Sequence, residues 1–126
     1  MMNKEQFIKE ICDKFPYLKD EILDEDYGGL FSLQVSVFRE NTQSAIDNCN
    51  NEVIETHLNF ISKNFKSFDN EVENSIVLSY IGKLDFKNYP MPKLFQDIQA
   101  ELAIYNQSAH KDETLIKVLK KISKEK

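Results

Sequence analysis

Carboxylates crowd one stretch of this chain. Between Asp20 and Ser62 nine acidic side chains stand against one basic side chain, Arg39. Carboxylates can hold a metal ion, act as acid and base in catalysis, or attract a cationic partner. The members of this acidic block are Asp20, Glu21, Asp24, Glu25, Asp26, Glu40, Asp47, Glu52 and Glu55.

A calcium site is the first chemistry to test against this block. The run Asp24-Glu25-Asp26-Tyr27-Gly28-Gly29 begins like a calcium loop, with acids at its first and third positions and glycine at its sixth. The fifth position is Gly28 instead of an oxygen ligand, and the twelfth, which needs a bidentate glutamate, is Val35. We therefore predict no metal site and no cofactor, with a weak incidental cation site as the alternative.

Catalytic machinery is the second possibility. His57 falls on the apolar side of its predicted helix, and His110 falls in a polar turn without a chemical partner. The sequence has no zinc-binding histidine signature, glycine-rich phosphate loop or nucleophile elbow. Cys12 and Cys49 lack a metal-ligand spacing and are predicted to be free thiols, Cys12 being a small buried hydrophobe. We predict a structural His57, no catalytic residues and no enzyme; an enzyme using carboxylates and His57 is the alternative.

The composition of the chain limits the class of partner that it can bind. The 126 residues fit one domain, 41% of them are hydrophobic, and the net charge is −5 with a pI near 5.1. This acidity argues against nucleic acid as the ligand and favours a basic protein. The start of the chain lacks the apolar region of a signal peptide, and no apolar run approaches the roughly 18 residues of a membrane span. We therefore predict a cytoplasmic protein that does not enter membranes.

The elements that must position these residues follow a period of 3.6. Proline at 16 suits the first turn of a short helix, and the glycine pair at 28 and 29 marks a turn. A strand is the alternative for Leu30–Phe38, where apolar residues also alternate. The predicted helices cover about 3–15, 16–23, 30–49, 53–65, 72–84, 94–105 and 115–122, with an extended connection at Tyr89–Pro92.

Six or seven helices with short connections predict an all-α protein in which neighbouring helices run antiparallel. We expect one domain over residues 1–126, either a bundle or a short stack of helices. A solenoid is the minority interpretation, because no repeating signature is visible.

The acidic block is predicted to form the binding surface. Carboxylates gathered at one end of a helical body would attract a basic protein quickly and in a salt-sensitive way. Tyr27 is the predicted anchor because tyrosine combines apolar area with a polar tip. The predicted partner-binding residues are Asp20, Glu21, Asp24, Glu25, Asp26, Tyr27, Glu52 and Glu55. A merely solvated face is the alternative.

Two stretches carry a family resemblance. Tyr27–Phe38, continuing through Ala45-Ile46 to Asn50–Val53, resembles the front half of a family of small bacterial helical proteins, and Asn70–Leu84 resembles its back half. Such proteins resemble the immunity proteins of polymorphic or contact-dependent toxin systems. Gly82 departs from the pattern, since an acidic residue is expected there.

The resemblance implies a protein that binds and neutralises a cognate toxin domain, such as a nuclease, by covering its basic cleft, and that is a monomer or a weak homodimer. The alternative is a self-associating regulatory or scaffold domain. In it, the acidic segment of one copy meets the lysine-rich end of another, where the last sixteen residues hold six lysines and three acids.

Overall fold

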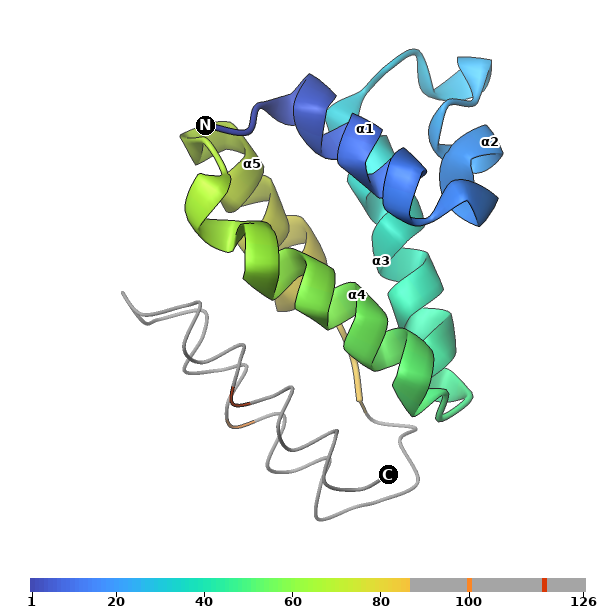
Figure 1. The fold of residues 1–126 in the computed structure, drawn as a ribbon. Helices are drawn as coiled ribbons and strands as arrows, with labels where there is room; N and C mark the ends of the chain where they lie inside the picture. The colour runs from blue at the N-terminus through green and yellow to red at the C-terminus, as the bar shows by residue number, and fades with distance from the viewer. Residues whose placement is uncertain (87–99, 101–116, 118–126) are drawn as a thin grey trace. The chain divides into compact units, whose positions relative to one another are not determined.

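The computed structural model describes residues 1–86, 100 and 117, and its elements are helical (Figure 1). The α-helices are α1 (Lys4–Lys14), α2 (Lys19–Ile22), α3 (Phe31–Asp47), α4 (Asn51–Asn64) and α5 (Asn70–Ser75). Shorter 3₁₀ segments cover Pro16–Leu18, Glu25–Tyr27, Phe65–Ser67 and Ile81–Lys83, and a π-helical segment covers Ile76–Tyr80. The described residues contain no strand, only an isolated bridge between Met2 and Phe68.

The all-α prediction is therefore confirmed for the described residues. The helices predicted over 94–105 and 115–122, and the extended connection at Tyr89–Pro92, lie outside them. The total of six to seven helices stays a prediction. Within the part of the chain that the structure describes, no helix is both long and apolar enough to cross a bilayer.

Local sequence explains where the first helix begins and ends. Asn3 and Gln6 form a capping box, in which the Asn3 side chain accepts from the Gln6 backbone N–H at 2.9 Å and the Gln6 side chain accepts from the Asn3 backbone N–H at 3.0 Å. Pro16 starts the following 3₁₀ turn, where its missing N–H costs nothing. Cys12 is buried on the apolar face of α1 as a free thiol, which confirms its structural interpretation.

The strand alternative for Leu30–Phe38 is wrong, because α3 is one continuous helix from Phe31. Its buried side chains follow the helical period, whereas Leu30 and Leu33 stay exposed. The alternating residues therefore do not share one face: Val35 and Val37 are buried, whereas Leu33 is exposed. The side chains buried on α3 are Gln34, Val35, Val37, Phe38, Thr42, Ala45 and Ile46.

The chain divides into two compact units. The first contains Met1–Asn41 and Ser67–Lys83, and the described part of the second contains Thr42–Lys66 and Leu84–Phe86. The prediction of a single domain over residues 1–126 stays a prediction.

Aromatic rings fill the core of the first unit. Phe7 of α1 is fully buried, and its ring meets those of Phe31 at 5.9 Å and Phe68 at 5.2 Å, both edge to face. The Phe38 ring stacks on Tyr80 with centroids 5.0 Å apart. These pairs hold the start of α3 against α1, and its middle against the π-helical segment.

A π-helical segment interrupts the last helical stretch of the first unit. Residues 72–84 were predicted as one helix, and the structure divides them into α5, the segment Ile76–Tyr80 and a 3₁₀ turn. The Arg39 guanidinium donates to the Ser79 carbonyl oxygen at 3.3 Å. The Arg39 side chain thereby supplies a hydrogen-bond donor to a backbone carbonyl in the segment where the regular α-helical hydrogen-bond pattern is lost.

The described part of the second unit joins the end of α3 to α4. Asn50 caps α4 by accepting from the Val53 backbone N–H at 3.3 Å. The Gln43 side chain forms two hydrogen bonds with the backbone of Asp85. It accepts from the Asp85 N–H at 2.9 Å and donates to the Asp85 carbonyl oxygen at 2.6 Å. These contacts fix α3 against the chain at Leu84–Phe86.

Candidate functional site

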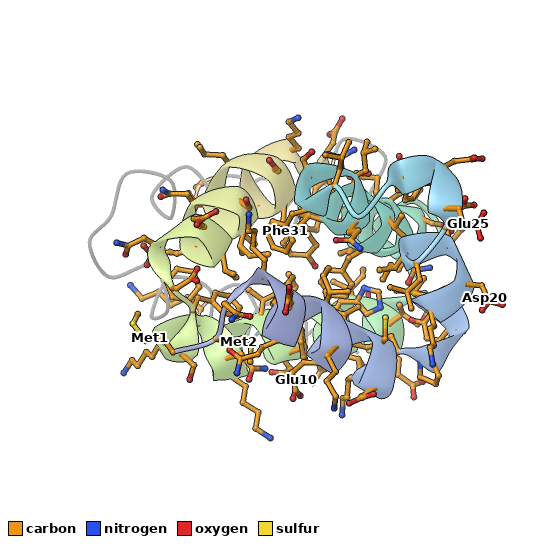
Figure 2. All side chains as sticks on the ribbon, turned by 90° about the horizontal axis from the view of Figure 1, so that it is seen from above. Met1, Met2, Glu10, Asp20, Glu25 and Phe31 are labelled. Atoms are coloured by element: carbon orange, nitrogen blue, oxygen red, sulfur yellow. The ribbon has the colours of Figure 1, made fainter. Side chains whose placement is uncertain are left out.

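Five of the predicted binding residues form an exposed group in the first unit, which we call the acidic end: Asp20, Glu21, Asp24, Glu25 and Asp26. Asp20 and Glu21 lie on α2, and the other three lie at the 3₁₀ turn that follows it. Figure 2 shows Asp20 and Glu25 at the same end of the ribbon, pointing outward. The structure therefore gathers these carboxylates on one solvated surface.

The turn within the acidic end has a local structural cause. The Asp24 carboxylate accepts from the Asp26 backbone N–H at 2.8 Å and so caps the 3₁₀ turn. Gly28 and Gly29 then reverse the chain with φ angles of 55° and 72°, a left-handed geometry that glycine adopts without strain. Asp24 thus has a structural role in addition to its charge, whereas Glu25 supplies only a backbone carbonyl to the turn.

Tyr27 is half-buried beside several carboxylates. Partial burial raises the pKa of its phenol, and the carboxylates of Glu21, Glu40, Asp24 and Asp26 raise it further because each opposes a phenolate. The hydroxyl therefore stays protonated at neutral pH. It can donate a hydrogen bond to a ligand that approaches the acidic end.

Glu40 is a member of this negative field that sequence analysis did not assign to the site. It lies on α3, far along the chain from Asp24, and only the fold brings it near Tyr27. Its carboxylate lies 3.9 Å from the Arg39 guanidinium, a loose ion pair with an exposed acid. The acidic count of the sequence included Glu40, but no spacing rule indicated its place.

No carboxylate of the acidic end forms an ion pair within residues 1–86, and Lys19 is the cation next to it along the chain. The ion pairs there join Lys4 to Glu71, Lys9 to Asp13, and Arg39 to Glu40. None of them involves a carboxylate of the acidic end. A charge surplus of this kind produces a field that extends about a Debye length into solution.

The two remaining predicted residues belong to the second unit. Glu52 is exposed in the first turn of α4, and Glu55 is half-buried one turn later. Their membership of the same surface as the acidic end stays a prediction.

An apolar groove accompanies the acidic end in the first unit. It has a volume of about 560 Å³ and runs between α1 and the start of α3. The acidic turn, which is the 3₁₀ turn Glu25–Tyr27 with its cap Asp24, connects two segments that line the groove, Leu23 and Gly29-Leu30. The residues that line it are Lys4, Glu5, Ile8, Leu23, Gly29, Leu30, Phe31 and Gln34. Sequence analysis did not predict this groove. The indication in the sequence was that Leu30 and Phe31 are apolar although they fall outside the helical face predicted to be buried.

His57 takes the structural place predicted for it. Its side chain is fully buried, and its Nδ1 lies 2.7 Å from the Thr42 hydroxyl. Burial lowers the pKa of the imidazole to about 4, so the ring is neutral at physiological pH. No group of three or more histidine, cysteine or acidic side chains in the described residues could hold a metal ion.

Comparison with known proteins gives the family. A family model described as "Domain of unknown function (DUF7674)" matches residues 8–107, and the chain belongs to this family. No curated protein and no solved structure matches the chain. The match covers the acidic end, α4 and the residues that line the groove from Ile8 onward.

Proposed function

We propose that this DUF7674 protein is an immunity protein, which binds a cognate bacterial toxin domain with a basic active-site cleft and neutralises it. The observation that carries the proposal is the acidic end, whose exposed carboxylates have no cationic partner among the described residues. The resemblance of Tyr27–Phe38 and Asn70–Leu84 to immunity proteins adds the biological context.

Inhibition by such a surface would be steric. A toxin that cuts nucleic acid binds phosphates with lysine and arginine side chains, and the acidic end offers these groups carboxylates in place of phosphates. A complex of ordinary size covers roughly 800 Å² on each partner, which is enough to close a substrate cleft. In this proposal the protein performs no chemistry of its own.

The acidic end would also set the rate of association. Complementary charge accelerates encounter between proteins by orders of magnitude at low salt, and the acceleration fades as salt screens the field. An inhibitor of a toxin made in the same cell benefits from fast capture. The salt dependence of the association rate is therefore the most direct readout of the proposal.

The proposal expects a toxin domain encoded next to this gene, and a gene neighbourhood without one would contradict it. The test uses that toxin domain. Coexpression with the protein should relieve the growth arrest that the toxin causes, and the two should form a complex in purified form. Glu25→Lys should slow association at low salt by about tenfold, since it reverses a charge that has no structural bond of its own. Growth arrest unrelieved by the protein would contradict the proposal.

Glu10→Lys is the matched control. Glu10 is an exposed acid on α1, outside the acidic end, and its reversal changes the net charge by the same amount (Figure 2). Equal slowing by both variants would assign the effect to overall charge and not to the acidic end. Light scattering at low salt completes the test, because a salt-sensitive homodimer would favour self-association instead.

A further inference from the structure

We propose that the groove between α1 and the start of α3 is the anchoring pocket for the partner, and that it receives one large apolar side chain from a basic segment of the bound protein. This inference rests on the proposed function and adds to it the chemistry of the contact. Three features of the first unit support it: exposed leucines, an amide oxygen without a protein donor among the described residues, and flanking negative charge.

The first feature is apolar surface left open to water. Leu23 and Leu30 line the groove with 50% and 59% of their surface exposed, and the half-buried Phe31 lies between α1 and α3. The buried Phe7 ring contacts the Phe31 ring edge to face at 5.9 Å. Exposed leucines around a rigid wall offer a partner's side chain apolar area whose burial is favourable, as at the centre of a protein interface.

The second feature is Gln34, a groove-lining side chain that keeps only 8% of its surface exposed. Its amide nitrogen donates to the Ile22 carbonyl oxygen at 3.4 Å. Among the described residues, nothing donates to the Gln34 amide oxygen. This oxygen keeps contact with solvent, and an N–H from a ligand in the groove can replace water as its donor.

The third feature is the charge at both sides of the groove. The acidic turn connects Leu23 to Gly29, so its carboxylates flank one side. Glu5 lines the other side, where the neighbouring Lys4 ammonium is already bound to the Glu71 carboxylate at 3.0 Å. Negative potential on both sides of an apolar centre fits a side chain such as leucine or phenylalanine between lysines or arginines.

Two other open places in the first unit lack this combination. A second pocket of about 630 Å³ lies around Met1 and Met2, and it is lined by polar residues of both charges and by the start of the chain. Leu78 is 69% exposed, but no described pocket includes it. Of these three places, only the groove beside the acidic end combines apolar surface with flanking negative charge.

A peptide probe tests the pocket with the full-length protein. The probe is a short capped peptide with one leucine between two pairs of lysines, and the matched probe has serine in place of leucine. We expect the leucine peptide to shift the backbone amide resonances of Leu23, Leu30 and Gln34, and to bind about tenfold more tightly than the serine peptide. Equal binding of both peptides, or no shift at these residues up to millimolar peptide, would overturn the pocket.

Leu30→Ser is the matching protein variant. Position 30 precedes α3, where serine can cap the helix, so the variant should fold while losing an apolar wall of the groove. It should weaken binding of the leucine peptide about tenfold, and Leu78→Ser should leave it unchanged.

The same variants separate this inference from the proposed function. If the protein neutralises the adjacent toxin and Leu30→Ser neutralises it with unchanged affinity, the pocket is wrong and the immunity role stands. If the leucine peptide occupies the groove but no toxin is neutralised, the pocket stands and the immunity role falls. A homodimer whose interface covers Leu30 would overturn the assignment of the groove to a foreign partner.

Discussion

The Thr42 hydroxyl oxygen lies 2.7 Å from Nδ1 of His57, and both side chains are fully buried. A neutral imidazole can donate to or accept from a hydroxyl, so the pair is compatible with a dry environment. A charged imidazole would lose its hydration there, and for this reason burial lowers the pKa of His57 to about 4.

The first prediction is a loss of stability in mild acid. The folded pKa of His57, about 4, lies below the ordinary value of 6.5, so the unfolded chain binds more protons between these two values. The His57 contribution is therefore complete above pH 6.5 and decreases as the pH falls toward 4. From pH 7 to pH 5 the free energy of unfolding should decrease by about 2 kcal/mol, as measured by urea denaturation.

His57→Gln is the control for that prediction. Glutamine can keep a hydrogen bond to Thr42 but has no titrating group in this range. The variant should lose about 2 kcal/mol less than the parent protein over the same pH interval. Identical pH profiles for the two proteins would show that other groups cause the acid sensitivity.

A second prediction concerns the turn between α3 and α4. Cys49 has a φ of 54°, while its N–H bonds the Ile46 carbonyl oxygen at 3.1 Å and the Asn50 N–H bonds that of Ala45 at 2.8 Å. This is a Schellman motif, whose left-handed position favours glycine. Cys49→Gly should raise the free energy of unfolding by about 0.5–1 kcal/mol, whereas Cys49→Ala should not raise it. Thermal unfolding under reducing conditions distinguishes the two.

A third prediction addresses the capping box of α1. Asn3→Ala removes the oxygen that accepts from the Gln6 N–H, and it should cost about 1 kcal/mol. Asn3→Ser retains a capping oxygen and should cost much less. Equal losses in chemical denaturation would mean that α1 is held by its apolar face alone.

A fourth prediction separates charge from structure at Asp24. Because its carboxylate accepts from the Asp26 N–H, Asp24→Lys removes the cap of the turn as well as the charge. Asp24→Asn keeps the cap and should leave stability within about 0.5 kcal/mol, whereas Asp24→Ala should cost up to about 1 kcal/mol. If Asp24→Asn slows association with the toxin at unchanged stability, the loss is electrostatic.

The helices were predictable from the sequence because their buried faces repeat with the helical period. Ile54, Leu58 and Ile61 of α4 are all buried as the stripe indicated. The π-helical segment was not predictable, because a departure from regular helical bonding leaves the apolar spacing of Val72–Tyr80 almost unchanged. The period of the apolar residues indicates which face of a helix is buried, but it does not indicate the pattern of backbone hydrogen bonds.

The acidic end was predictable because its members are neighbours along the chain. The approach of Glu40 to Tyr27 and the groove beside Leu23 were not, since both depend on where α3 lies against α1 and α2. Gln34 illustrates the limit, because a glutamine within an apolar run gives no sign that its oxygen will lack a donor. Contacts between distant segments decide a binding site, and a single sequence carries little information about them.

The isolated β-bridge between Met2 and Phe68 has a practical consequence for attaching the protein to a sensor surface. The Asp69 N–H donates to the Met2 carbonyl oxygen at 2.9 Å, which holds Met2 next to the start of α5. Met1 and Met2 lie at the opposite end of the ribbon from Asp20 and Glu25 (Figure 2). A biotin or fluorophore fused ahead of Met1 would tether the molecule by that far end. The carboxylates would then face the solution, free for capture measurements on a sensor surface.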